Sequence, residues 1–224
     1  MSGQASLTVL HEPFSYLYYV AKHPERAVAM NPDPGRPHCY DSIRDSLLSA
    51  STSGPTFFKD MAYHCLDEIV QDSDFLRSVT HSFLVRDPMQ AIASYFALNQ
   101  NVTREEIGYE ALWRLCERVG EVCGSTPSVI DADDLQRAPL KIMKSYCTAL
   151  GVEFCQESLE WKPTMEPAWD VWKGWHREVA ASSGINRGHK SYRHTPRNHP
   201  VLRELYEFHL PFYKKLHRLR IRQP

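Results

Sequence analysis

The feature that most constrains the fold of this chain is an alternation of short β-type runs with longer helical patterns. The β-type runs cover residues 7–10, 56–58, 81–85 and 128–130. This alternation is typical of a parallel sheet covered by helices. We therefore predict an α/β fold with an open, mainly parallel sheet. Since no repeat, low-complexity tract or linker interrupts the 224 residues, we expect a single domain over residues 1–224.

Helix start signals support this pattern. Asp87 followed by Pro88 predicts a helix that has an aspartate N-cap and a proline at its first position. Thr103 and Glu106 have the spacing of a capping box, which predicts a long helix that continues to about Cys123.

Composition excludes several classes of partner. The 26 Lys+Arg and 27 Asp+Glu leave a net charge of −1, so no global positive field attracts nucleic acid or an acidic membrane. The apolar runs are shorter than the ~20 residues of a membrane span. The opening MSGQASLTVL lacks the pattern of a signal peptide. We therefore expect a soluble, cytoplasmic protein.

The cysteines and histidines predict no metal. None of the six cysteines forms a CxxC pair, and His38-Cys39 and His64-Cys65 lack the spacing of metal ligands. Without a secretory context, we expect reduced thiols rather than disulfides.

Three of the predicted strands end in charged or polar pairs, namely His11-Glu12, Lys59-Asp60 and Arg86-Asp87. In open parallel sheets, ligands bind beyond the carboxyl ends of the strands. Two of the three pairs contain a cation, which favours an anionic ligand.

Arg86 and Ser94 form the most specific motif in the sequence. Arg86 follows a strand, and Ser94 lies eight residues later in the predicted helix, about 9 Å along its axis at ~1.5 Å per residue. A guanidinium and a hydroxyl in this arrangement can hold one phosphate from two sides. The alternative is that Arg86 pairs with Asp87 or Asp60 and that Ser94 has no ligand.

Several segments resemble sulfotransferases, in the order in which that family has them. FLVRDPMQAIASYFAL is similar to the family segment in which an Arg, and a Ser eight residues later, bind the 3′-phosphate of the sulfate donor PAPS. TVLHEPF, PTFFKDM and SVIDADDL resemble other strand ends of the family, so the resemblance covers about residues 7–150. It implies a P-loop NTPase-like fold, PAPS as co-substrate, a small-molecule acceptor and no metal.

The resemblance also implies roles for three strand-end residues. Glu12 is the first candidate for the base that takes the acceptor proton, and His11 is the second. Lys59 would stabilise the oxygen that bridges sulfate and phosphate. The alternatives are a surface carboxylate at Glu12, a structural His11 and a salt bridge from Lys59 to Asp60. The family's cytosolic members have Lys-Thr-His at this strand end, whereas this chain has Lys59-Asp60-Met61.

The chain departs from the family at its start. Sulfotransferases begin with a strand, a phosphate loop and a helix, but only MSGQAS precedes the first predicted strand, and no GxxxxGK[ST] occurs. We therefore expect a sulfotransferase-like protein without the N-terminal phosphate loop. It is either a truncated enzyme or an inactive relative that serves as a nucleotide-binding or interaction protein. The absent Walker lysine argues against a small kinase.

Two segments near the C-terminus complete the candidate site. The basic loop with Arg187 and Lys190 falls where the family closes over the 3′-phosphate, although a solvated basic face is the alternative. Trp169, Trp172 and Trp175 recur every three residues in a predicted helical segment, either as core or lid packing or as an acceptor-binding face.

Overall fold

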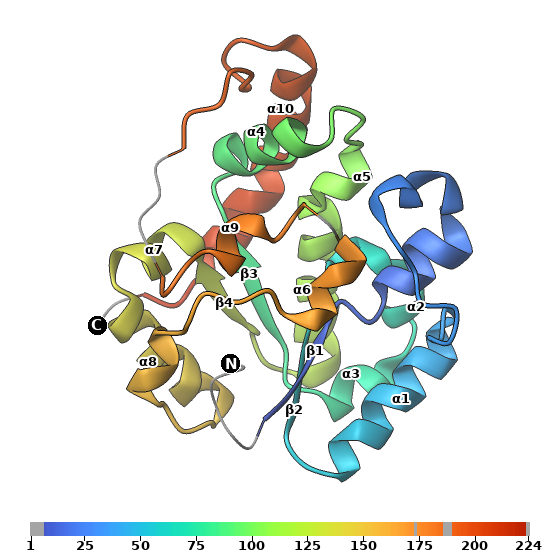
Figure 1. Ribbon diagram of the computed structural model, residues 1–224. Coiled ribbons are helices and arrows are strands. Elements are labelled where there is room, and N and C mark those ends of the chain that lie inside the picture. Colours follow the sequence, from blue (N-terminus) through green and yellow to red (C-terminus); the bar gives the residue numbers. More distant parts are fainter. Residues whose placement is uncertain (1–6, 173, 186–189, 223–224) are drawn as a thin grey trace. The chain divides into compact units, whose positions relative to one another are not determined.

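The computed structural model describes residues 7–172, 174–185 and 190–222 (Figure 1). By their internal contacts these residues form two compact units. Unit 1 comprises the described parts of residues 1–71 and 155–184, and unit 2 those of residues 72–154 and 185–224. Each unit is an α/β assembly with its own pair of parallel strands. The predicted fold class is therefore confirmed, while the single domain stays a prediction.

Unit 1 is built on strands β1 (Thr8–His11) and β2 (Thr56–Lys59), which pair in parallel with Thr8 opposite Thr56 and His11 opposite Lys59. Its helical segments are η1 (Leu17–Lys22), η2 (Pro24–Ala29), α1 (Tyr40–Thr52), η3 (Ala62–His64), α2 (Leu66–Ile69), η4 (Gln156–Leu159), η5 (Pro167–Trp172) and α9 (Arg177–Ala180). The core is rich in aromatic side chains, among them Phe14, Tyr16 and Tyr18, each at most 2% exposed.

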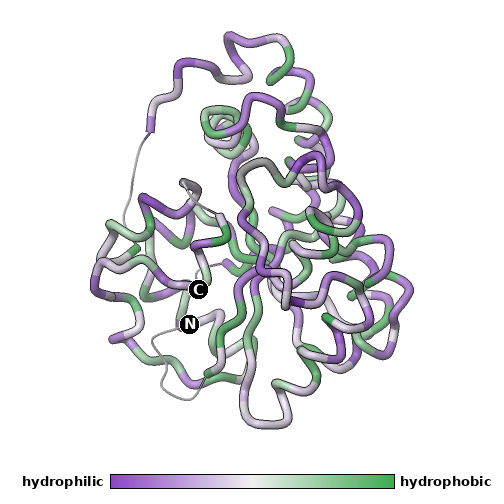
Figure 2. Tube along the Cα trace, turned by 45° about the vertical axis from the view of Figure 1, so that its right-hand side comes forward, coloured by the Kyte–Doolittle hydropathy of each residue, from purple (hydrophilic) through white to green (hydrophobic). Residues whose placement is uncertain are grey.

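Unit 2 is built on strands β3 (Ser82–Val85) and β4 (Ser128–Asp131), which also pair in parallel. Its helices are α3 (Ser73–Ser78), α4 (Pro88–Leu98), α5 (Arg104–Ile107), α6 (Tyr109–Cys123), α7 (Ala132–Arg137), α8 (Pro139–Leu150) and α10 (Pro200–Arg218). Ile92 of α4 and Leu202 of α10 are fully buried against each other in the core. Hydrophobic and hydrophilic residues alternate at short intervals along the described chain (Figure 2), so each long helix can bury one side.

The start of α4 is as the sequence predicts. Asp87 is the N-cap, its side chain accepts a hydrogen bond from the backbone N–H of Met89 at 2.8 Å, and Pro88 is the first helical residue. This cap fixes the turn between β3 and α4, and therefore the position of Arg86 in unit 2.

The capping box also forms, but the helix that it begins is short. Thr103 and Glu106 exchange both hydrogen bonds, and α5 then ends at Ile107. Gly108 adopts a left-handed conformation with φ of 77°, which breaks the predicted long helix into α5 and α6.

The tryptophan segment was wrongly predicted as one helix. It contains the 3-10 turn η5 and the short helix α9, with Gly174 at φ of 102° between them. Proline at position 167 and this glycine interrupt the helical pattern, so the three tryptophans do not share one helix face. No helix in the described chain is both long and apolar enough to cross a membrane.

Candidate functional site

In unit 1, the structure brings together the three candidate residues Glu12, His11 and Lys59. The parallel register places His11 beside Lys59 at the carboxyl ends of β1 and β2, and Glu12 follows β1 directly. The Lys59 ammonium donates a hydrogen bond to Glu12 Oε1. His11 Nε2 lies 3.9 Å from the same oxygen, which is too far for a hydrogen bond. The predicted alternative, a salt bridge from Lys59 to Asp60, is not the contact that forms.

Glu12 has a strained backbone. Its φ of 44° makes it the one non-glycine residue with positive φ in the described part of the chain. Such a conformation costs on the order of 1–3 kcal/mol and persists only where neighbouring contacts enforce it. Here the Glu12 N–H donates to the carbonyl of Lys59 at 2.8 Å, and its own carbonyl accepts from the backbone N–H of Ser15 at 3.1 Å. Strain of this kind gathers at functional sites, so it adds weight to Glu12 as a reacting group.

Asp60 forms a hydrogen bond with the backbone of the segment that follows Glu12, a contact that the sequence did not predict. Asp60 Oδ2 accepts from the backbone N–H of Phe14 at 2.6 Å, and Oδ1 accepts from the N–H of Met61 at 2.8 Å. The same Oδ1 lies 2.5 Å from Nδ1 of His64, which is 1% exposed. Asp60 therefore joins the ends of both strands, and the only signal in the sequence is a carboxylate immediately after a strand.

Electrostatics keeps Glu12 ionised although it is buried. Burial, the largest influence, works to raise the pKa of Glu12, but the Lys59 charge and hydrogen bond, together with His64 and His11, outweigh it. The pKa of Glu12 is therefore lowered. Burial also lowers the pKa of His11, whose Nε2 is buried without a hydrogen-bond partner among the described residues. The cluster thus combines an ionised carboxylate with an adjacent ammonium, which suits proton abstraction beside a developing negative charge.

In unit 2, Arg86 lies at the end of β3 with its backbone held by Tyr109. The Tyr109 hydroxyl donates to the carbonyl oxygen of Arg86 at 2.6 Å, and burial, then Asp87, raises the pKa of this tyrosine. Nothing in the sequence singles out Tyr109, because its partner is a backbone atom 23 residues away.

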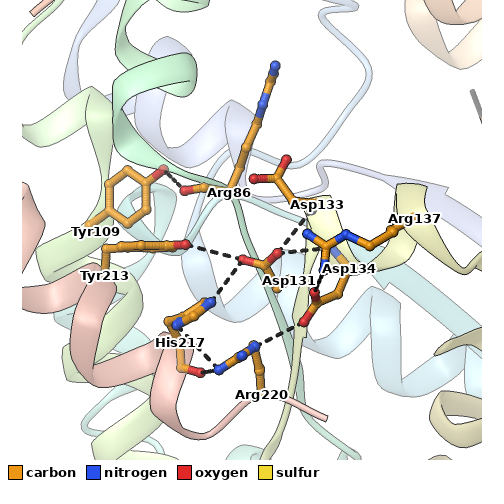
Figure 3. Close-up of polar contacts among 9 residues, drawn as sticks. All are labelled: Arg86, Tyr109, Asp131, Asp133, Asp134, Arg137, Tyr213, His217 and Arg220. Atoms are coloured by element: carbon orange, nitrogen blue, oxygen red, sulfur yellow. Dashed lines mark hydrogen bonds and ion pairs between the residues drawn. The ribbon is translucent and has the colours of Figure 1, made fainter. Parts of the chain in front are cut away.

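Two carboxylates near Arg86, those of Asp131 and Asp134, are occupied by other donors. Asp131, 3% exposed, caps α7 by accepting from the backbone N–H groups of Asp133 and Asp134 at 3.0 and 3.1 Å. The side chain of Asp134 pairs with Arg137 at 2.8 Å and with Arg220 at 2.9 Å. Neither of these two carboxylates therefore pairs with Arg86 (Figure 3).

The Arg86 guanidinium is available for an external ligand. Its side chain extends away from Asp131 and Asp134 (Figure 3), and it forms no hydrogen bond or ion pair with another described side chain, although its charge acts on the exposed carboxylate of Asp133. Asp87, the predicted alternative partner, uses its carboxylate as the cap of α4. An unpaired arginine at a strand end is a fitting anion ligand.

Of the other predicted nucleotide-binding residues, Ser94 and Lys190 lie in the same unit. Ser94 is a half-buried residue of α4. Lys190 is exposed, and Arg187 lies outside the described residues. The rings of His194 and His199, which follow the basic loop, pack at 5.9 and 5.0 Å from the ring of Phe96, two residues beyond Ser94 in α4.

Two expected absences, of a phosphate loop and of a metal, stay predictions. The absence of a phosphate loop concerns residues 1–6, outside the described residues, and stays a prediction. Across residues 7–172, 174–185 and 190–222, no three His, Cys, Asp or Glu side chains gather as a metal site requires.

Comparison with known proteins gives one family and two relatives. A family model described as "Sulfotransferase domain" matches residues 1–219. Two Arabidopsis thaliana proteins, named branched-chain-amino-acid aminotransferase-like protein 1 and protein 2, are 31% and 29% identical to this chain over 147 residues. These matches cover 64% of this chain, which spans about a quarter of the length of each relative. No solved structure gives a significant match.

Proposed function

Because the chain belongs to the sulfotransferase family, we propose that it transfers a sulfuryl group from PAPS to a hydroxyl or amine of a small-molecule acceptor. The observation that carries the proposal is the contact between Glu12 and Lys59 at the ends of two parallel strands, in which a buried carboxylate on a strained backbone holds the lysine ammonium. We do not assign to this chain the aminotransferase activity that the relatives' names mention, because the chain spans only about a quarter of those proteins.

Residues of each unit, taken by itself, fit one half of this reaction. In unit 2, the unpaired Arg86 guanidinium and the Ser94 hydroxyl suit the 3′-phosphate of PAPS, and Lys190 and Arg187 would add positive charge. In unit 1, Glu12 is the first candidate for the base and His11 the second, and Lys59 suits the negative charge that develops on the bridging oxygen. PAPS supplies the activated sulfuryl group.

Glu12 is preferred to His11 because of hydrogen bonding and charge. Its low pKa keeps it ionised, and Lys59 fixes one of its oxygens, which leaves the other oxygen for the acceptor proton. The lowered pKa of His11 likewise favours its basic form, the neutral imidazole, but its Nε2 is enclosed. A base that acts on the acceptor must reach it, directly or through one water.

The test is sulfate transfer by the full chain, with PAPS and a panel of alcohols and amines, read by mass spectrometry of the sulfated product. We expect Glu12→Gln to slow transfer about 100-fold or more, the usual contribution of a general base, and to leave PAP affinity unchanged. Glu25→Gln, at an exposed glutamate of the same unit, is the matched control and should retain full activity. PAP binding with no transfer to any acceptor would instead make this chain a nucleotide-binding relative without catalysis.

A further inference from the structure

The carbonyl oxygen of Arg86 lies between the end of a strand and the start of a helix. The register of β3 and β4 ends with Val85 opposite Asp131, so Arg86 is one residue beyond the last strand pair. The hydrogen bonds of α4 begin at the carbonyl of Asp87, its N-cap. The peptide group between Arg86 and Asp87 therefore falls outside both regular patterns, and its part-buried carbonyl needs a partner of another kind.

Tyr109 supplies this partner. Its hydroxyl donates to the Arg86 carbonyl oxygen at 2.6 Å, and its side chain is buried, with 5% of the residue exposed. Tyr109 is the first residue of α6, directly after the left-handed Gly108. Because a carbonyl can only accept, the phenol must stay protonated, and burial favours this form by raising the pKa of Tyr109.

The ring of Tyr109 is itself fixed by α10. It meets the Tyr213 ring edge-on with centroids 6.1 Å apart, and it lies 5.7 Å from the ring of the fully buried His209. The Tyr213 hydroxyl lies 3.4 Å from Asp131 Oδ2 at the end of β4. Figure 3 shows both hydroxyls pointing at the neighbouring strand ends. The hydroxyl that holds the Arg86 backbone is therefore part of the packed interior of unit 2.

The free side chain of Arg86 makes this backbone contact important. The guanidinium forms no hydrogen bond or ion pair with another described side chain, although its charge acts on the exposed Asp133. Its direction is therefore set mainly by the backbone from which it extends. A ligand that binds a mobile guanidinium must pay the entropy of ordering it, and a backbone that is already fixed lowers this cost.

We infer that Tyr109 is a positioning residue for the nucleotide site, because its hydroxyl fixes the Arg86 backbone and so directs the guanidinium at the 3′-phosphate of PAPS or PAP. The inference rests on the proposed function, in which Arg86 binds that phosphate. Tyr109 acts through Arg86 and not through contact with the nucleotide. Its hydroxyl should therefore strengthen nucleotide binding only while the guanidinium is present.

The experiment is calorimetric titration with PAP of four forms of the full chain, namely the native protein, Tyr109→Phe, Arg86→Ala and the double variant. Tyr109→Phe keeps the ring and removes the donor. It should weaken PAP binding about three- to tenfold, which corresponds to the loss of one hydrogen bond. In the Arg86→Ala protein the same change should leave PAP affinity unchanged, because the guanidinium that Tyr109 positions is gone.

Tyr146→Phe is the matched control at the other end of the same strand. Tyr146 is also 5% exposed, and its hydroxyl lies 2.8 Å from Oγ of Ser82, the first residue of β3. This variant loses a buried tyrosine hydrogen bond far along the chain from Arg86 and should bind PAP like the native protein. Urea unfolding of both phenylalanine variants measures their stability. Equal weakening of PAP binding in Tyr109→Phe and Tyr146→Phe would overturn the inference.

The double variant separates positioning from general stability, and Arg86→Ala separates this inference from the proposed function. A loss from Tyr109→Phe that is as large in the Arg86→Ala protein as in the native one would make Tyr109 a structural residue and overturn the inference. If Arg86→Ala weakens PAP binding and Tyr109→Phe does not, the inference fails and the proposed nucleotide site stands. PAP binding that is unaffected by Arg86→Ala would reject the proposed nucleotide site, and the inference with it.

Discussion

Replacing Lys59 by Met should raise the pKa of Glu12. As the pH is lowered, the variant should therefore lose activity at a higher pH than the native enzyme does. In the native protein, burial works to raise this pKa, and the Lys59 ammonium provides the largest opposing effect. Methionine keeps a long unbranched side chain at this position but removes the charge and the hydrogen bond to Glu12 Oε1. Glu12 would then retain its burial with less compensation.

The size of the change follows from the contact itself. A hydrogen bond to a charged group contributes about 1.5–3 kcal/mol. The Lys59 side chain is 48% exposed, so solvent screening favours the lower end of this range. At 1.36 kcal/mol per pKa unit, about 1.5 kcal/mol corresponds to a rise of roughly one unit in the pKa of Glu12.

The assay is the pH dependence of kcat/KM for sulfate transfer. A general base works only when it is ionised, so the acidic limb of the profile should move about one unit to higher pH in Lys59→Met. Lys59→Arg keeps the positive charge and should leave the limb near its native position. An acidic limb that stays in place in Lys59→Met, or moves to lower pH, would refute the assignment of that limb to Glu12.

Three further changes test other parts of the structure. Arg86→Ala should weaken PAP binding by about 1.5–3 kcal/mol in calorimetry, which is the range for a charge-assisted hydrogen bond. The control Arg218→Ala, at an exposed arginine, should leave PAP binding unchanged, and equal losses in both variants would remove Arg86 from the nucleotide site. Asp60→Asn directs either its amide NH₂ or a weaker, uncharged oxygen at the Phe14 N–H and should lower the free energy of unfolding in urea by about 1–3 kcal/mol; a change under about 0.5 kcal/mol would contradict the role of Asp60. Burial lowers the pKa of His209 from 6.5 to about 4, so the folded state is disfavoured as pH falls below 6.5, by about 3 kcal/mol at pH 4. His209→Leu should abolish this part of the acid sensitivity, and an unchanged pH dependence of unfolding would contradict it.

The sequence predicts the parts of the site that depend on strand ends. The signal is an apolar run followed closely by a charged residue. It locates Glu12 and Arg86 directly after β1 and β3, and Lys59 as the last residue of β2. The Asp87–Pro88 signal locates the start of α4 because capping is a local interaction between neighbouring residues.

The sequence does not predict the contacts that join distant residues. The bond from the Phe14 N–H to Asp60 and that from the Tyr109 hydroxyl to the Arg86 carbonyl link residues 46 and 23 positions apart. Each depends on the three-dimensional path of the chain, and a backbone partner has no residue type that a pattern could detect. The left-handed conformation of Glu12 is equally hidden, since such a backbone usually calls for glycine.

The most direct test of Glu12 as the base compares two acceptors in the Glu12→Gln variant. One is phenol, which must lose its proton during transfer, and the other is 4-nitrophenol at a pH where it is already ionised. A missing base should slow transfer to phenol about 100-fold or more and leave transfer to the ionised acceptor close to the native rate. Equal slowing with both acceptors would show that Glu12 does not take the proton.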